Sequence, residues 1–557
     1  MFAKILIFLL ITLTISQFAH SMDDSGILEK TLPFKERKQT GTFRNVPRID
    51  EEIKTKDTGP QVVIDKITIK GNSLIKDEEI FLITNKYLEK SLNLQNLNAI
   101  INEIGFYYRK NGYWARAILP EQDIENGQLL IEIYEGILGS VEIEKKDKNI
   151  RFSEKRSKAF ILYGQKKRTP INILKLENAV KELSNVPGIE SSIVLKEGEN
   201  TSETDVVIKL SNTPMINGLI KFDNHGTRST GRSRGIFSVN LDGLFNIGDR
   251  FLFQYLQVRD IKYKAYGLSL PILNDGTKIK YMYTNMNYEL GYPFKSLDAE
   301  GKSNTKKFSI SKPLIFLNNI NVRFDYDFLI SEYSNESLGA TISDKSIKSS
   351  VLSSILTNSD SFMGEGTTWG ILSFTNGKLD LSGQQSNLNS DSLGAKTNGH
   401  FNKIFSSFTR IQRLGRRTTF WLMTDFQFSF KNLDSSQKLS LGGGNGIRAY
   451  PVSEANGDNA IIIKSEIHHY LSKGIEGLIF FDYGRVKLYK NTWTPTTNNY
   501  SLKGAGIGII SRSFYDATLK TYLARKVGSN KGADTNGNDN DGTDNTFTFW
   551  IEAFKNF

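Results

Sequence analysis

The stretch INVRFDYDF, residues 320–328, alternates apolar and polar side chains without a break. Successive side chains of a β-strand point to opposite faces, so the two kinds separate. The apolar face carries Ile320, Val322, Phe324, Tyr326 and Phe328. The polar face carries Asn321, Arg323, Asp325 and Asp327. FWLMTDFQFSF (420–430) and FTFWIEAFKNF (547–557) repeat the scheme, which predicts a series of amphipathic strands.

The composition of the two faces indicates a transmembrane β-barrel. The apolar face is strongly aromatic, as the girdles at membrane interfaces are. The opposite face carries charges, which a packed soluble core rejects and a wet lumen accepts. Long polar connections are expected at 339–348, 382–398 and 527–545. Residues 212–557 have room for roughly 14–18 strands, and we expect about 16 antiparallel ones. A large soluble β protein is the alternative.

The start of the chain, residues 1–21, is typical of a secretory signal peptide. Lys4 precedes an apolar run that is too short to span a bilayer, and Ala19-His20-Ser21 fits the small-x-small cleavage rule. We expect a mature start near Met22, with a retained anchor as the alternative. Residues 22–60 are polar and predict a linker. Acidic residues followed by basic ones suit a short helix at its start, although Pro33 interrupts it, and a disordered leader is the alternative.

Two small α+β units are expected between the linker and the barrel, at 61–137 and 138–211. VVIDKITIKGNSLI (62–75) alternates into a Gly-Asn turn, helical periodicity follows, and ARAILPEQDIENGQLLIEIYEG returns to strands. The second unit repeats this order, with helices near 152–163 and 172–185 and strands at 140–145, 191–198 and 202–210. Each unit has a normal size for a small domain.

Composition excludes several functions. The chain has no cysteine for disulfides, and its five histidines show no HExxH or paired spacing, so we expect no metal site. The net charge of +11 is dispersed and no recognition motif accompanies it, so we expect no nucleic-acid partner. No nucleophile motif is present, which predicts a protein that is not an enzyme and needs no cofactor. DTNGNDNDGTDN (534–545) has no glycine at the sixth position and no closing glutamate, both of which an EF-hand calcium loop requires, and we interpret it as a floppy surface loop.

The stretch LGGGNGIRAYP (441–451) carries an arginine and a tyrosine beyond four glycines. Gly442, Gly443, Gly444 and Gly446 can adopt positive φ, which permits a sharp descent of the chain. An arginine placed inside a barrel needs a carboxylate partner, because an unpaired buried charge is costly.

Two motifs resemble a known family. The first unit resembles a polypeptide-transport-associated (POTRA) domain through a Tyr-x-x-x-Gly-Tyr, Leu-Pro-x-Gln, Gly-x-Leu and Glu-Gly pattern. Those residues are Tyr108, Gly112, Tyr113, Leu119, Pro120, Gln122, Gly127, Leu129, Glu135 and Gly136. FDNHGTRSTGRSRGIFSVNLDGLFNIGDRF, at the barrel start, resembles the Asn-x-Gly, Thr/Ser-Gly and Gly-Asp pattern of the haemolysin secretion/activation proteins. These are the outer-membrane transporters of two-partner secretion, in a superfamily with the barrel-assembly insertases.

The resemblance implies a place for the arginine. Family members carry Val-Arg-Gly-Tyr on a long loop that folds back into the barrel, and Ile447-Arg448-Ala449-Tyr450 is similar to it. The family's carboxylate lies in Phe-x-Asp-x-Gly, which Phe480, Asp482 and Gly484 match. We therefore expect Arg448 and Asp482 to form a lumen-facing ion pair, with Gly446 in the bend. From the residues alone, Arg448 on a solvated loop and Asp482 in a turn remains the alternative.

The resemblance also implies the function. POTRA domains in the periplasm of a Gram-negative bacterium bind a large partner protein of β-helical adhesin or haemolysin type, and the barrel in outer-membrane lipid secretes it. The segment near 23–38 matches the position of the family's plug helix. Phe557 resembles the C-terminal signal read by the barrel-assembly machinery. A barrel-assembly insertase and a passive porin or receptor are the alternatives, and the sequence does not separate transport of the partner from its activation.

Overall fold

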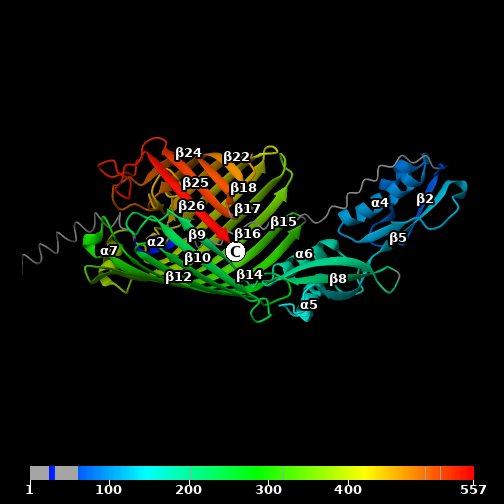
Figure 1. Ribbon diagram of the computed structural model, residues 1–557, viewed down its shortest axis with the longest axis horizontal. Coiled ribbons are helices and arrows are strands. Elements are labelled where there is room, and N and C mark those ends of the chain that lie inside the picture. The colour runs from blue at the N-terminus through cyan, green and yellow to red at the C-terminus, as the bar shows by residue number, and fades with distance from the viewer. Residues whose placement is uncertain (1–23, 32–59, 201, 318, 496, 515) are drawn as a thin grey trace, which may run out of the picture.

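The computed structural model describes residues 24–31, 60–200, 202–317, 319–495, 497–514 and 516–557. A large β-barrel lies at one end of the elongated molecule, and two α+β units extend from one rim of the barrel (Figure 1). The expected signal peptide and most of the expected linker lie outside the described residues. Among the described residues, no helix is both long enough and apolar enough to cross a bilayer.

The first unit packs its helices on a three-stranded sheet. In this sheet β2 runs parallel to the central strand β5, and β4 runs antiparallel to it. An Asn93–Asn96 capping box begins the long helix, whose apolar stripe enters the core. The elements are β1 (Val62–Val63), β2 (Lys66–Lys70), α3 (Asp77–Thr84), η1 (Asn85–Tyr87), β3 (Ser91–Leu92), α4 (Leu94–Lys110), β4 (Ala115–Ile118), η2 (Glu125–Gly127) and β5 (Gln128–Glu135).

Several residues of the POTRA-like sequence pattern bind the backbone of loops and strands within this unit. Glu135 accepts hydrogen bonds from the amides of Ser73 and Leu74, both at 2.8 Å, and from the Tyr108 hydroxyl at 2.9 Å. Burial opposes ionisation of Glu135, but these bonds outweigh it and lower the pKa of the carboxyl. The Gln122 side chain exchanges two 2.8 Å hydrogen bonds with the backbone of Leu130. These residues of the sequence pattern therefore stabilise the fold of the domain.

The second unit repeats the first. Strand β6 runs parallel to the central strand β8, and β7 runs antiparallel to it. A separate apolar core fills the space under its two helices. The elements are β6 (Ile137–Lys145), α5 (Glu154–Gly164), α6 (Ile173–Ser184), β7 (Ile189–Glu197) and β8 (Glu203–Asn212).

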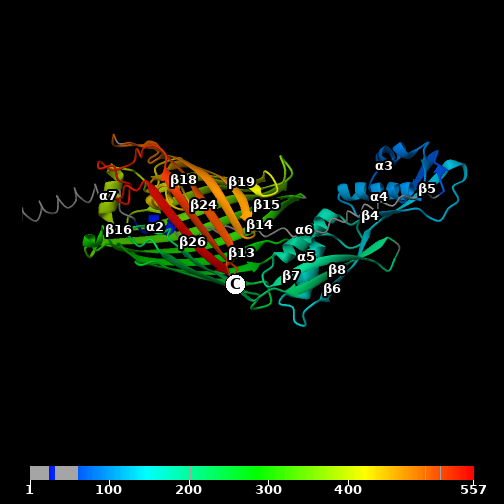
Figure 2. The ribbon, with the colours of Figure 1, turned by 45° about the horizontal axis from the view of Figure 1, so that its top comes forward.

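The second unit is tied to the barrel rim. Arg156 donates hydrogen bonds to the carbonyls of Ile247 at 3.2 Å and Pro271 at 2.9 Å, which belong to two neighbouring turns of the barrel. Lys278 returns a bond to the Asn185 carbonyl at 2.7 Å. These contacts define the end of the barrel from which the two units project, as Figure 2 shows.

The barrel closes through antiparallel pairing of β26 with β9. The prediction of about 16 antiparallel strands after two α+β units is confirmed among the described residues. The barrel strands are β9 (Ile216–Asp223), β10 (Arg234–Asp242), β11 (Arg250–Gln257), β12 (Ile261–Pro271), β13 (Lys278–Glu289), β14 (Glu300–Leu317), β15 (Ile320–Ser337), β16 (Ala340–Asp360), β17 (Gly366–Asp380), β18 (Gly399–Arg413), β19 (Thr418–Ser429), β22 (Asn459–Ser472), β23 (Ile475–Lys487), β24 (Asn499–Phe514), β25 (Ala517–Lys526) and β26 (Phe547–Asn556).

The two faces of β15 separate as the alternation predicts. Tyr326 and Phe328 are exposed on the outer face. On the lumen face Arg323 pairs with Asp325 at 2.9 Å, and Asp327 pairs with Lys307 of β14 at 2.8 Å. Charges are tolerated on this face because the lumen is polar.

The prediction of a long connection at 339–348 is wrong. Strands β15 and β16 meet at a two-residue turn, Leu338–Gly339, and their ladder continues up to that turn. Backbone hydrogen bonds hold the ladder together, so polar side chains there do not end the strands. The connection at 382–398 is present and contains α7 (Gln385–Leu393).

Candidate functional site

The connection between β19 and β22, residues 430–458, folds back into the barrel and is called the lumen loop. It contains η4 (Ser435–Gln437), β20 (Leu439–Ser440) and β21 (Asn456–Gly457), and β20 and β21 pair at its base. At its tip, Arg448, Ala449 and Tyr450 are buried. The loop therefore occupies the lumen and reaches the barrel wall.

The glycines of the lumen loop have different roles. Among the four, only Gly443 has a positive φ, of 101°. A Cβ on Gly446 would lie 1.8 Å from the Leu441 carbonyl oxygen, and one on Gly442 would lie 2.0 Å from the Pro451 oxygen. These two glycines permit close approach of backbone segments instead of an unusual φ.

Arg448 meets Asp482 of β23 in a two-pronged ion pair. The Arg448 Nε donates to Asp482 Oδ2 at 2.9 Å, and Nη2 donates to Oδ1 at 2.6 Å. The backbone amide of Arg448 adds a bond to Oδ2 at 3.0 Å. Both side chains are at most 1% exposed. Bidentate, charge-assisted hydrogen bonds of this kind fix geometry as well as contributing energy.

A second carboxylate also holds Arg448. Glu466 of β22 lies 2.8 Å from Arg448 Nη1, and the Phe480 ring lies under the guanidinium with its centroid 3.5 Å from Cζ. The guanidinium is thus enclosed by two carboxylates and two aromatic rings, the second being Tyr522 with its centroid 5.2 Å from Cζ. Sequence reasoning missed Glu466, because no motif marks it.

The spacing of Phe480, Asp482 and Gly484 follows from strand geometry. Residues at i, i+2 and i+4 share one face of a strand, so all three point into the lumen. A Cβ on Gly484 would lie 2.9 Å from Leu441 and 3.1 Å from Ile447. Gly484 therefore leaves space for the lumen loop beside the ion pair.

The neighbouring strand β24 accommodates Ala449. A Cβ on Gly504 would lie only 2.6 Å from the Ala449 Cβ. A Cβ on the next inward-facing glycine, Gly506, would lie 2.5 Å from the Phe480 ring. The methyl group by which Ala449 departs from the family pattern thus packs against a backbone without a side chain.

We expect Gly504→Ala to displace the loop tip, because the added methyl group overlaps Ala449. Overpacking a close contact costs about 1–3 kcal/mol. Ala449→Gly in the same chain is expected to restore the wild-type state, since it removes the opposing methyl group. Thermal unfolding of the detergent-solubilised protein reports the effect. Gly477→Ala is the control, because the atoms nearest to an added Cβ there belong to the Leu471 side chain. If the changes in stability caused by Gly504→Ala and Ala449→Gly simply add in the double variant, the two positions are not in contact.

The tip of the loop is also bound near the seam where β26 meets β9. Trp550 Nε1 donates to the Arg448 carbonyl at 2.7 Å, and Thr548 donates to the Ala449 carbonyl at 3.1 Å. The His225 ring packs edge-on against Trp550, with centroids 5.2 Å apart. Burial lowers the pKa of His225 to about 4, so this ring is neutral at physiological pH.

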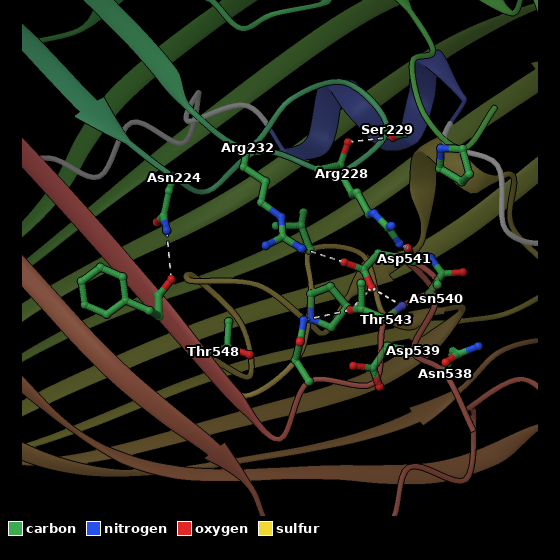
Figure 3. Close-up of a pocket in the computed structure, with 18 of the residues that line it drawn as sticks. Asn224, Arg228, Ser229, Arg232, Asn538, Asp539, Asn540, Asp541, Thr543 and Thr548 are labelled. Atoms are coloured by element: carbon green, nitrogen blue, oxygen red, sulfur yellow. Dashed lines mark hydrogen bonds and ion pairs between the residues drawn. The ribbon is translucent and has the colours of Figure 1, made fainter. Parts of the chain in front are cut away.

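The outer loop, residues 527–546, covers the lumen loop from the side opposite the POTRA units. Asn530 donates to Glu454 Oε1 at 2.5 Å, and the Asn540 amide donates to Oε2 at 2.8 Å. Arg228 and Arg232, from the β9–β10 connection, bind Asp541 at 2.9 and 3.2 Å (Figure 3). A cavity of about 830 Å³ lies between these connections. This segment is therefore packed in place, unlike the floppy loop expected from its composition.

Closure of the outer loop is expected to depend on pH. Burial and then the Asp539 carboxylate raise the pKa of Glu454 from 4.5 to about 8. Because the pKa in the closed loop is raised, closure is strongest below pH 4.5 and weakens as pH rises through about 8. Cleavage of the outer loop by protease added to intact cells should increase over this range. Glu454→Gln should remove the pH dependence, and an unchanged profile in that variant would contradict the assignment.

A short helix, α2 (Ser25–Thr31), lies inside the barrel (Figure 1). Leu28 is fully buried, and Glu29 accepts hydrogen bonds from Ser303 and Thr305 at 2.9 and 3.1 Å. Lys30 donates to the Lys438 carbonyl of the lumen loop at 2.8 Å. The described helix ends two residues before Pro33. The helix and the lumen loop therefore fill the lumen together.

Phe557 lies on the outer side of the seam. It exchanges backbone hydrogen bonds with Gly218 of β9 at 2.9 and 3.1 Å and stacks on Phe237, with centroids 6.3 Å apart. A Cβ on Gly218 would lie 2.6 Å from the Phe557 ring. Phe557 therefore helps to join the last strand to the first.

A closed 16-stranded barrel, two α+β units on one rim and an arginine-bearing loop in the lumen define a class of outer-membrane protein transporters. A family model described as haemolysin secretion/activation protein ShlB/FhaC/HecB matches residues 202–510, and a ShlB-type POTRA domain model matches residues 62–136. The chain belongs to this haemolysin secretion/activation family. It is an outer-membrane transporter of two-partner secretion, with POTRA domains in the periplasm.

Individual proteins that are similar to this chain support the same family assignment. The heme/hemopexin transporter protein HuxB of Haemophilus influenzae (strain 86-028NP) is 27% identical over 505 residues, covering 88% of this chain and 86% of HuxB. The outer membrane transporter CdiB of Dickeya dadantii (strain 3937) is 22% identical, covering 74% and 73%. The solved structure of CdiB from Escherichia coli has the same fold, with a TM-score of 0.67, 17% identity and coverage of 92% and 93%.

Proposed function

We propose that the partner is a large β-helical protein of adhesin or haemolysin type, which crosses the lumen unfolded after α2 and the lumen loop have moved. The observation that carries this proposal is how the lumen is filled. Ion pairs and hydrogen bonds dominate the contacts of Arg448, Glu29 and Lys30. Such contacts exchange with water or with a passing chain more readily than a close-packed apolar core does.

The POTRA units supply the capture surface in this proposal. Strand β7 pairs only with β8 among the described residues, so its other edge offers backbone donors and acceptors. An unfolded chain with β propensity can add to such an edge with little demand on its side chains. Folding of the partner outside the cell then biases its movement outward, because the periplasm supplies no ATP.

Crosslinking during export tests the route. A photo-crosslinker at Thr375, which faces the lumen of β17, is expected to capture the partner in transit. The same group at Phe374, which faces the lipid, is the matched control and should not capture it. Equal capture at both positions, or none at Thr375 in secreting cells, would contradict passage through the lumen.

Deleting the gene separates the remaining alternatives. Loss of one secreted protein supports a dedicated transporter, whereas failure of many barrels would support an insertase. A neighbouring gene for a long β-repeat protein with its own signal would identify the partner. We also propose that the chain has no catalytic role, since its site pairs charges without presenting a nucleophile beside a base.

We propose that the barrel-assembly machinery inserts this chain and that Phe557 takes part. Phe557→Ala is expected to reduce the folded barrel in the outer membrane several-fold, because it removes the ring that covers Gly218 at the seam. Heat-modifiable migration on gels measures the folded fraction. Phe557→Tyr should retain most of it, and a normal level in the alanine variant would remove Phe557 from this role.

A further inference from the structure

A chain of charged side chains continues from Arg448 toward the periplasmic end of the barrel wall. Glu466 uses Oε1 for Arg448, and its Oε2 lies 2.7 Å from His468 Nε2 on the same strand. On its other side, His468 Nδ1 contacts Glu476 Oε1 of β23. Glu476 Oε2 in turn accepts a bond from Arg512 Nη1 of β24 at 2.8 Å. The order along the wall is therefore Arg448, Glu466, His468, Glu476 and Arg512.

The far end of this chain lies at the rim that carries the POTRA units. The backbone amide of Arg512 donates to the Gly474 carbonyl at 2.7 Å, in the turn between β22 and β23. This turn is at the same barrel end as the turns that contact the second POTRA unit, because antiparallel strands alternate in direction. Arg512 is 43% exposed, whereas His468 is 2% exposed.

Because His468 lies between two carboxylates, its imidazole must carry a proton on both ring nitrogens. An ionised carboxylate only accepts hydrogen bonds, so an imidazole with a carboxylate at each nitrogen must donate from both. The Trp421 ring, stacked at 4.6 Å, covers the imidazole and supplies no charge. The other charged group acting on Glu466 is Lys464 of the same strand. With the imidazole protonated, charges alternate in sign from Arg448 to Arg512.

Loss of this proton would disturb Glu466. A neutral imidazole donates from one nitrogen only, so a lone pair would face one of the carboxylates. Two buried negative charges would then lie on either side of an uncharged ring, which is costly for groups shielded from water. Glu466 is the group that also holds Arg448, so its displacement would weaken the grip on the lumen loop.

We infer that His468 is a positioning residue for the lumen loop: its proton keeps Glu466 on Arg448, and its loss as pH rises releases the loop toward the open pore. The inference rests on the proposed role of Arg448 in holding the loop. It adds a second, proton-dependent anchor to the Asp482 pair and connects that anchor to the periplasmic rim through Glu476 and Arg512.

The test records pore opening of the purified full-length protein in planar lipid bilayers from about pH 5 to about pH 9, a range centred near histidine titration. The wild-type protein is expected to open more often as pH rises. His468→Gln, which cannot carry the proton, should open at least several-fold more often than wild type at the acidic end and lose the pH-dependent increase. His469→Gln is the matched control, because the neighbouring His469 lies on the outer face, bonded to Thr418 at 2.9 Å.

A fixed charge provides the second variant. His468→Lys should keep the pore closed at alkaline pH, where wild type opens. Every protein compared, including the one called wild type here, also carries Glu454→Gln, so titration of Glu454 contributes to none of the profiles. A His468→Gln profile that matches wild type overturns the inference, as does a His468→Lys pore that opens at alkaline pH like wild type. Normal secretion by an Asp482 variant would instead overturn the proposed role of the ion pair, so the two failures are distinguishable.

Discussion

Replacing Asp482 with alanine is expected to abolish secretion of the partner protein while leaving the folded barrel in the outer membrane. The substitution removes two hydrogen bonds to the Arg448 side chain and one to its backbone amide. Removing one partner of a buried ion pair costs about 3–5 kcal/mol. Glu466 then remains as the carboxylate paired with Arg448, and it does not replace the bidentate contact or the bond to the backbone amide. The tip of the lumen loop that carries Arg448 should then leave its site. The barrel should still fold, because its strands pair with one another without the loop.

The measurement compares secreted partner with folded barrel in the same cells. Asp327→Ala is the matched control, since it also removes a lumen-facing carboxylate from an ion pair, with Lys307 at 2.8 Å. Arg448→Ala should resemble Asp482→Ala, and the double variant should be no worse than either, because all three lose the same interaction. Unaltered secretion in the Asp482 variant would refute the role of the pair.

Placing a carboxylate at Leu28 is expected to open the pore. Leu28 of α2 is fully buried inside the barrel. An unpaired buried charge costs on the order of 3 kcal/mol or more, which corresponds to about 100-fold lower occupancy of the lumen by the helix. Cells with Leu28→Asp should therefore admit a large antibiotic that the outer membrane normally excludes. Growth in that antibiotic measures the effect.

Ile27→Asp is the control for the helix, because Ile27 is adjacent and only partly buried. It should leave the cells resistant. Secretion should persist in both variants, since the proposal requires the helix to leave during export. Equal sensitivity of the two variants would contradict the argument that burial at position 28 is what makes the added charge costly.

The architecture could be predicted from the sequence because its signals are periodic. The alternation in 320–328 depends on the strand repeat alone, and the repeated helix-and-strand order predicted two α+β units. Strand ends were less predictable. The polar residues after Gly339 resemble a loop, yet they continue the ladder, because backbone pairing does not require an apolar face.

Only part of the site could be predicted. Arg448 and Asp482 belong to motifs, so they could be matched before their contact was known. Glu466 and Trp550 bind the same loop from other strands, and no short motif joins them to it. One usable signal was present: glycines at 504, 506 and 508 alternate along β24 and share its inward face. Three inward glycines mark a wall against which something else packs.

The contact between position 449 and position 504 has an evolutionary consequence. The barrel wall and the loop tip share one small volume there, since Gly504 offers only hydrogen and Ala449 contributes the methyl group. In relatives with glycine at the position of Ala449, a larger residue at the position of Gly504 becomes tolerable. Aligned family sequences should therefore show the two positions covarying inversely in size.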